Sequence, residues 1–319
     1  MSFVLPFRRL TGIVILLVLV VVSAAGLIFQ QIRAKSTRWT MVNVSPVRYQ
    51  ADCHLLELPD GRVVLIDAAE GGDAPDTIVP FLKTKRIRRI DLVIISHFHW
   101  DHYGKLIEII NAGIAVKRVA INLPGSREIA DAEKPWGCNW EDVQATLRFL
   151  TDHQIPYFTP QIGEKLIEIK RGKIITALEV VCLYDGIHTP IGRTDINDTS
   201  ILLRLTHGPT RALFTGDLNQ RLGAWLATST FDLKADILKV PHHGTEGLAP
   251  NEFFAKVDPK VAMIPSPEEL WYSLRSKRSR DYFAERKIPA YVSGIHGSVT
   301  VEMTNSGYVI TPEHVDSKP

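Results

Sequence analysis

Residues 96–102 read Ser-His-Phe-His-Trp-Asp-His. Three histidines and an aspartate stand within six positions, directly after the apolar run Leu92–Ile95, which is typical of a buried strand. Because successive residues point in different directions where a strand ends, His97 and His99 can bind one metal while Asp101 and His102 bind a second beside it. Imidazole and carboxylate ligands favour zinc, with manganese or iron as alternatives. Surface histidines before a helix capped by Asp101 are the competing interpretation, which four ligand-type residues at this spacing disfavour.

Two later strand ends carry further ligand-type residues. One predicted strand runs into Thr215-Gly216-Asp217, and another into Pro241-His242-His243-Gly244. A carboxylate after a strand can bridge two cations, and a histidine before glycine can approach a metal closely. Each pattern alone is equally consistent with a capped turn or a hydrogen-bonded loop. Together with residues 96–102, they predict one site at one edge of the sheets.

The composition places few limits on function. The chain has 319 residues, with 45% hydrophobic and 23% charged residues, which is ordinary for a globular protein with one large or two small domains. A net charge of +2 gives no argument for a polyanionic partner. Three widely separated cysteines exclude a disulfide framework and leave the redox compartment undetermined.

The amino-terminal residues predict a membrane anchor. Arg8 and Arg9 precede residues 10–29, an uncharged apolar run long enough to span a bilayer as a helix. We expect a short cytoplasmic segment at 1–9, a transmembrane signal anchor at 10–29 and the catalytic body outside the cytoplasm. A signal peptide cleaved after the small residues 23–25 is the alternative. Residues 30–40 are expected to form a linker.

The remaining pattern predicts an α/β body at residues 41–311 and a short tail at 312–319. Pro59-Asp60-Gly61 is a strong turn signal between two short apolar runs and predicts a hairpin. Helices are expected at 104–111, 141–153, 223–227, 251–255 and 279–286. In each half of the chain, strands come first and are followed by alternating strands and helices. This repeated order predicts two packed sheets with helices outside.

The order His-x-His-x-Asp-His, Thr-Gly-Asp and His-Gly resembles the metallo-β-lactamase superfamily. This resemblance implies an αββα sandwich with one or two divalent cations. It assigns His97 and His99 to metal site one, and Asp101, His102 and His243 to metal site two. Asp217 would bridge the two sites.

Further motifs are similar to the soluble metallo-β-lactamase domain of ComEC, the DNA-uptake channel protein. They are the hairpin region 52–67, the segment 85–91, Asn197-Asp198-Thr199-Ser200-Ile201 and the run 238–244 ending in Pro-His-His-Gly. The resemblance covers approximately residues 41–311, and the multi-helix channel part of ComEC is absent from this chain.

One position departs from the superfamily pattern. Most members have a further histidine before the bridging aspartate, where this chain reads Asp195-Ile196-Asn197-Asp198. Asn197 or Asp198 is therefore a candidate third ligand of metal site one. His242 is a candidate metal or substrate ligand, although the resemblance favours His243, the residue before glycine. The basic residues near Trp271 are candidate substrate-binding groups: Arg275, Lys277 and Arg278.

We therefore predict a metal-dependent hydrolase with two divalent cations. The expected activity is that of a phosphodiesterase or nuclease that uses a metal-bound hydroxide, oriented by Asp101 as catalytic residue. A phosphodiester or nucleic-acid substrate and the membrane are the expected partners, and no protein partner is evident. An envelope ester, lactone or β-lactam hydrolase is one alternative, and a non-catalytic binding module of the same fold is another.

Overall fold

The computed structural model describes residues 36–44, 50–72, 74–184 and 195–315. The predicted anchor at residues 10–29 lies outside these ranges. Among the helices within them, none combines the length and the apolar character needed to cross a bilayer.

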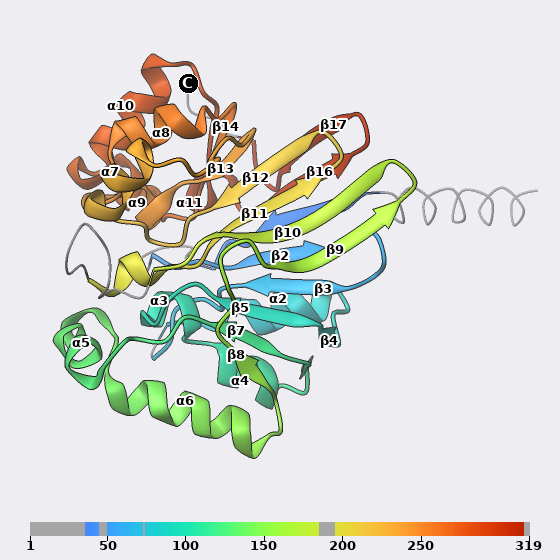
Figure 1. The fold of residues 1–319 in the computed structure, drawn as a ribbon, viewed down its shortest axis with the longest axis vertical. Coiled ribbons are helices and arrows are strands. Elements are labelled where there is room, and N and C mark those ends of the chain that lie inside the picture. The colour runs from blue at the N-terminus through green and yellow to red at the C-terminus, as the bar shows by residue number, and fades with distance from the viewer. Residues whose placement is uncertain (1–35, 45–49, 73, 185–194, 316–319) are drawn as a thin grey trace, which may run out of the picture.

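Two mixed sheets pack face to face within the described residues (Figure 1). The first sheet has the order β17 (Gly307–Pro312), β16 (Val299–Thr304), β1 (Thr37–Met41), β2 (His54–Glu57), β3 (Val63–Ile66), β5 (Leu92–Ile95), β7 (Val119–Ile121) and β8 (Tyr157–Phe158). The second has the order β15 (Ala290–Val292), β14 (Val261–Ile264), β13 (Ile237–Lys239), β12 (Thr210–Phe214), β11 (Leu202–His207), β10 (Ile174–Cys182) and β9 (Lys165–Arg171). A small separate pair joins β4 (Arg89–Ile90) to β6 (Ala115–Val116).

Strand β5 explains why two cores form. All four of its residues are buried, and alternate side chains of a strand point to opposite faces. Leu92 and Ile94 join the core between the sheets, whereas Val93 and Ile95 join the core beneath the helices. A strand that is covered on both faces reads as a continuous apolar run, which is the pattern seen here.

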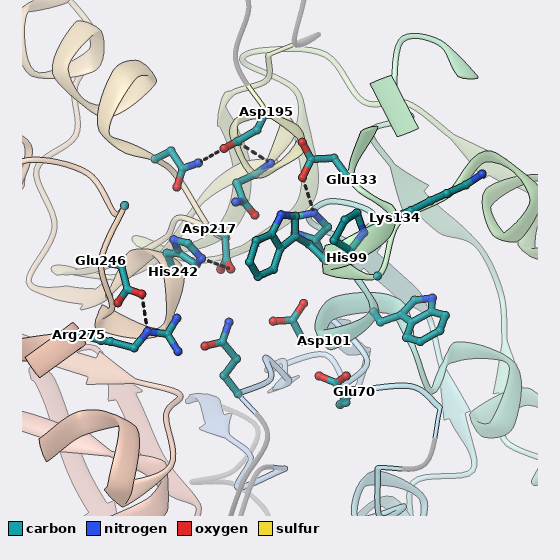
Figure 2. Close-up of a pocket in the computed structure, with 18 residues that line it drawn as sticks. Glu70, His99, Asp101, Glu133, Lys134, Asp195, Asp217, His242, Glu246 and Arg275 are labelled. Carbon is teal, nitrogen blue, oxygen red and sulfur yellow. Dashed lines mark hydrogen bonds and ion pairs between the residues drawn. The ribbon is translucent and has the colours of Figure 1, made fainter. Parts of the chain in front are cut away.

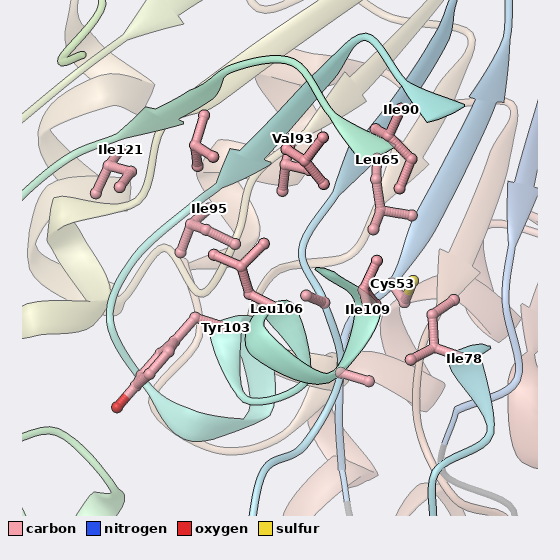
Figure 3. Packing of buried hydrophobic residues seen from close by; sticks show 14 of the residues in the cluster. Cys53, Leu65, Ile78, Ile90, Val93, Ile95, Tyr103, Leu106, Ile109 and Ile121 are labelled. Atoms are coloured by element: carbon pink, nitrogen blue, oxygen red, sulfur yellow. The ribbon is translucent and has the colours of Figure 1, made fainter. Parts of the chain in front are cut away.

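Helices cover the outer face of each sheet. On the first sheet lie α2 (Ile78–Thr84), α4 (Leu106–Asn111) and α6 (Trp140–Asp152), whose buried apolar residues share one cluster with Val93, Ile95 and Ile121. Figure 3 shows Ile78 of α2 and Leu106 and Ile109 of α4 in this cluster. On the second lie α7 (Gln220–Thr228), α8 (Asn251–Val257) and α10 (Lys277–Glu285). Figure 1 shows the two helical layers on opposite outer sides, so the predicted αββα sandwich is confirmed.

The predicted hairpin is present, but the first strand begins earlier than expected. Between β2 and β3, the Leu58 amide donates to Arg62 O at 2.9 Å, and Gly61 has a φ of 86°. Strand β1 begins at Thr37, within the range assigned to the linker, and pairs with both β16 and β2. Thr37, Trp39 and Met41 are buried on one side of it, which gives this polar segment a place in the sheet.

The helix predicted at 104–111 is present as α4, which begins at Leu106, and a separate helical turn, α3 (Trp100–Tyr103), precedes it. The Lys105 amide donates to Ala68 O at 3.0 Å, and the Gly104 amide lies 3.0 Å from both Ala69 O and Trp100 O. Because these donors turn towards the loop after β3, the helical ladder is interrupted. The break fixes α3 as a separate turn that carries Asp101 and His102.

Candidate metal centre

Four strand ends meet at one edge of the sandwich. Parallel strands β3 and β5 end there, and so do parallel strands β12 and β13 of the other sheet. Their following residues are Asp67, Ser96, Thr215 and Val240. A cavity of about 600 Å³ opens above them, lined by acidic, histidine and tryptophan side chains (Figure 2).

Four ligand-type side chains converge at the floor of this cavity. One ligand atom from each of Asp101, His102, Asp217 and His243 lies within 4.8 Å of all the others. Oδ2 of Asp217 is 3.3 Å from His102 Nε2 and 3.2 Å from His243 Nε2. Oδ2 of Asp101 is 3.1 Å from His243 Nε2. The structure thus brings together the residues predicted for metal site two and for the bridge.

His97 and His99 form the neighbouring pair. Nε2 of His97 lies 3.2 Å from Nδ1 of His99. Two nitrogens bound to one tetrahedral zinc at 2.0–2.1 Å are about 3.3 Å apart, so this spacing fits a shared cation. The His97 and His102 rings are 4.1 Å apart between centroids, which places the two predicted sites side by side.

Hydrogen bonds to the ring nitrogens that face away from the cluster orient the histidine rings. Nδ1 of His102 lies 2.9 Å from Asp67 Oδ2, and Nδ1 of His243 lies 3.0 Å from Pro265 O. Nε2 of His99 makes no hydrogen bond within the described residues, but it lies at an ion-pair distance of 3.5 Å from a carboxylate oxygen of Glu133. A ring nitrogen that donates outward leaves the other nitrogen as an acceptor directed inward. The histidine tautomers that this arrangement selects are those that a metal requires.

The charge of the cluster also fits cations. Among the described residues it contains four carboxylates, of Asp52, Asp67, Asp101 and Asp217, against one ammonium, of Lys239. Burial alone would lower the pKa of His243, but Asp217 and Asp52 raise it to about 10. Burial would likewise raise the pKa of Asp101, but His102 and His243 hold it well below its usual range. The carboxylates therefore favour positive charge at the positions where a metal would bind.

Gly216 and Ser200 connect Asp217, the predicted bridging residue, to His97 of the predicted metal site one. Gly216 has a φ of 48°, and a Cβ at this position would collide with Ser200 Oγ. Because glycine leaves room, Ser200 Oγ accepts from the Asp217 amide at 3.0 Å and lies 3.3 Å from His97 Nδ1. One hydroxyl thus fixes the orientation of both Asp217 and His97.

Lys239 lies beneath the cluster and is 1% exposed. Its Nζ contacts the Asp52 carboxylate, donates to Gly216 O at 2.8 Å and lies 3.5 Å from Asp217 Oδ1. Asp52 in turn lies 3.5 Å from His243 Nδ1. The buried ammonium thus connects the Asp217 carboxylate, through Asp52, to His243.

A sequence profile described as "Metallo-beta-lactamase superfamily" matches residues 46–266. The chain belongs to the metallo-β-lactamase superfamily. A curated superfamily relative, ComE operon protein 3 of Bacillus subtilis (strain 168), is 30% identical over 190 residues, which confirms the predicted resemblance to the ComEC-type domain. The match covers 59% of this chain and 21% of the relative, so the chain spans about a fifth of that protein's length.

Two solved structures show weaker similarity to this superfamily member. CmlA, a diiron β-hydroxylase from Streptomyces venezuelae, is 12% identical with a TM-score of 0.46, over 80% of this chain and 52% of CmlA. A diphosphatase from the PhnP family is 16% identical with a TM-score of 0.45, over 84% of this chain and 98% of the diphosphatase.

The remaining predicted site residues fall into two groups. Asn197, His242 and Arg275 line the cavity, and Arg275 forms an ion pair with Glu246. The other three lie elsewhere: Lys277 pairs with Asp281, Arg278 donates to Leu248 O at 2.8 Å, and Asp198 accepts from the Asn219 amide at 2.8 Å. Lys277 and Arg278 thus belong to the surface of α10 rather than to the cavity.

The sequence motifs assigned no role to several residues of the centre. Glu133 and Trp136 reach the cavity from the segment of α5 (Arg127–Ala132) and η1 (Lys134–Trp136), which has no ligand motif. Lys239 stands in a strand that reads as apolar, where a charged residue is itself a signal for a buried partner. Asp67 directly follows a buried strand, which is the same signal that Asp101 and Asp217 carry.

Proposed function

We propose that this chain is a metal-dependent hydrolase that cleaves phosphodiesters, most simply in nucleic acid. One observation carries the proposal: ligand atoms of Asp101, His102, Asp217 and His243 converge within 4.8 Å at the floor of an accessible cavity. The pair His97 and His99 stands beside them and supports a second cation. We propose zinc at both sites, with manganese or iron as alternatives.

When bound, a pair of divalent cations polarises a phosphoryl oxygen and lowers the pKa of a nearby water. The protein's own contribution is orientation and charge. Asp101 is held in its ionised form beside His243, so its carboxylate can accept a hydrogen bond from a nucleophile and align it. Asp217 is fixed through its amide by Ser200, which holds its carboxylate between the two histidine groups.

The rim of the cavity supports an anionic substrate with aromatic groups. Arg275 provides a guanidinium that can exchange its Glu246 partner for a phosphate oxygen. Trp100 and Trp136 line the same cavity, and Trp136 is 72% exposed. An exposed indole that lines the same cavity as a guanidinium is suited to stacking a nucleobase while the phosphodiester reaches the metals.

The test uses the full chain in detergent micelles, supplied with zinc or manganese. We expect hydrolysis of bis-p-nitrophenyl phosphate and nicking of plasmid DNA, both abolished in D101N and H97A. D258N is the matched control, because Asp258 is an exposed carboxylate at the end of α8, and asparagine tolerates its φ of 54°.

The same assay separates the competing functions. A metal-loaded wild type that hydrolyses lactones or β-lactams but not phosphodiesters would establish the ester-type alternative. A metal-loaded wild type that hydrolyses none of these substrates would favour a binding module. Metal content measured on the same samples ensures that inactivity is not mistaken for metal loss.

We further propose that residues 10–29 anchor the chain and that the folded body lies outside the cytoplasm, as the apolar run and the flanking Arg8 and Arg9 suggest. Protease added to intact cells should digest the body if this topology is right. Digestion that requires cell lysis would place the body in the cytoplasm.

A further inference from the structure

Metal site one lacks a third histidine in the position where the superfamily usually provides one. His97 and His99 supply two nitrogens 3.2 Å apart, and Asp217 supplies a carboxylate that can be shared with metal site two. Zinc sites of this kind use three or four protein ligands. A further donor on the open side of this pair would complete the site.

The segment before the bridging aspartate is occupied in other ways. Asp198 Oδ1 accepts from the Asn219 amide at 2.8 Å, and Asp195 Oδ2 accepts from Asn219 Nδ2 at 2.6 Å. These contacts hold the loop that leads into α7. Asn197 lines the cavity, and its buried Oδ1 has no hydrogen-bond partner among the described residues, so it remains the competing donor.

The imidazole of His242 lies near the carboxylate of Asp217. Its Nε2 lies 4.0 Å from Asp217 Oδ2 (Figure 2). The same oxygen faces His102 and His243. The side chain is 20% exposed and lines the cavity, whereas His243 is fully buried. Nδ1 of His242 is buried without a hydrogen-bond partner in the described part of the chain. The ring is therefore positioned at the site without any other evident bonding role.

The backbone at His242 adopts a strained, left-handed conformation. His242 and His243 have φ values of 50° and 53°, in the left-handed region that side chains other than glycine seldom adopt. Both the amide and the hydroxyl of Thr245 donate to His242 O at 2.9 Å, which holds the turn. After this reversal, Nε2 of His243 and Nε2 of His242 lie 3.2 Å and 4.0 Å from Asp217 Oδ2. Strain of this kind persists where the surrounding structure enforces it and is a sign of function.

We propose that His242 is the third histidine ligand of metal site one, through Nε2, alongside His97 and His99. This inference rests on the proposed two-metal centre. It makes Pro-His-His-Gly a double ligand motif, in which His243 serves metal site two and His242 serves metal site one. It also explains how the site can be complete without a histidine at residues 195–198.

The test is zinc stoichiometry of the purified full chain, measured by mass spectrometry after dialysis against buffered zinc. We expect two zinc ions per wild-type chain and one per chain in H242N and H242G, with the affinity of the lost site reduced more than about 100-fold. Asparagine and glycine both tolerate a φ near 50°, so the turn survives each change. Circular dichroism and thermal melting confirm folding.

N197A and H97A complete the design. H97A should also bind one zinc, whereas N197A should keep two. Cobalt substitution gives an independent signature, because loss of an imidazole from metal site one changes the visible absorption of the ion there. Two tightly bound zinc ions in H242N and H242G, or loss of one in N197A instead, would overturn the proposal. A wild type that binds a single zinc and still cleaves phosphodiesters would overturn it as well, while leaving the hydrolase function intact.

Discussion

Nζ of Lys239 lies 3.5 Å from Oδ1 of Asp217, which leaves Oδ2 of the same carboxylate to face the histidines. The same ammonium contacts Asp52, so a single buried cation serves two carboxylates. Burial alone would lower the pKa of Lys239, but Asp52 and Asp217 raise it. The charge that supports the proposed bridge is therefore fixed within the core and does not depend on solvent.

Replacing Lys239 with methionine should destabilise the protein. K239M keeps the volume of the side chain but leaves the Asp52 carboxylate buried without its cation, which costs about 3–5 kcal/mol. The double variant K239M/D52N should recover most of this free energy of unfolding, because both charges are then removed. Urea denaturation of the two single variants and the double variant measures the coupling.

Phosphodiester cleavage should not recover in the double variant K239M/D52N, although its stability does. K239M/D52N loses the ammonium that orients Asp217, so we expect it to remain well below wild type in phosphodiester cleavage although it folds. Full activity in the double variant would show that Lys239 balances charge without positioning the bridge.

Metal removal should lower the free energy of unfolding, and rebinding of metal should release protons. A chelator leaves the carboxylates around Asp217 balanced by protonated histidines, and metal that binds only the folded state stabilises it by mass action. Without metal, the pKa of His243 is raised to about 10, so at neutral pH a cation must displace its proton. Apparent metal affinity should therefore rise with pH, by about one log unit per pH unit for each proton displaced.

Calorimetric titration of chelator-treated protein with zinc, in two buffers of different ionisation enthalpy, measures these protons. Metal affinity that is constant between pH 6 and 8 would contradict the predicted competition. D258N is again the control. Asp258 is exposed and is not among the residues that line the cavity, so its replacement should change neither the zinc affinity nor the number of protons released.

Asp198 should make stability depend on pH. Burial raises its pKa to about 7, from 3.8 for an ordinary aspartate. Between these values the folded chain keeps a proton that the unfolded chain has lost, so the contribution of Asp198 to the free energy of unfolding is present below about pH 4 and is lost as pH rises towards 7. The loss amounts to at most about 4 kcal/mol.

D198N should remove that decline while its amide oxygen still accepts from the Asn219 amide. Denaturation curves at pH 5 and pH 8 for wild type and D198N give the difference directly. A stability difference between the two proteins that does not change with pH would show that Asp198 titrates normally.

Trp136 should affect substrate binding without affecting folding. Because its indole is 72% exposed, W136A should change stability by less than about 0.5 kcal/mol. If the ring stacks a base, KM for a single-stranded oligonucleotide should rise about 5- to 100-fold, with a much smaller effect on the same oligonucleotide made abasic at the contact. V309A, which truncates an exposed apolar side chain on β17, is the surface control. Equal effects of W136A on both substrates would exclude stacking.

Much of the architecture could be predicted because it depends on local pattern. The run Leu92–Ile95 and the turn Pro59-Asp60-Gly61 predicted elements that the structure contains. The failures have local physical causes. The linker expected at 30–40 contains the start of β1, because the threonines of this strand obscure the apolar alternation. The separate turn α3 depends on carbonyls of residues 68 and 69 that sequence periodicity cannot locate.

The sequence by itself determined the ligand types and their placement at strand ends, because ligand chemistry and strand patterning are properties of short segments. Only the tertiary structure decided which of them meet. Asp101 and His243 are 142 residues apart and lie 3.1 Å from each other, since two different sheets end at the same edge. Glu133 behind His99, Lys239 beneath Asp217 and the left-handed turn that brings His242 to the cavity depend on that packing, and no local pattern specifies a contact between segments so distant in the chain.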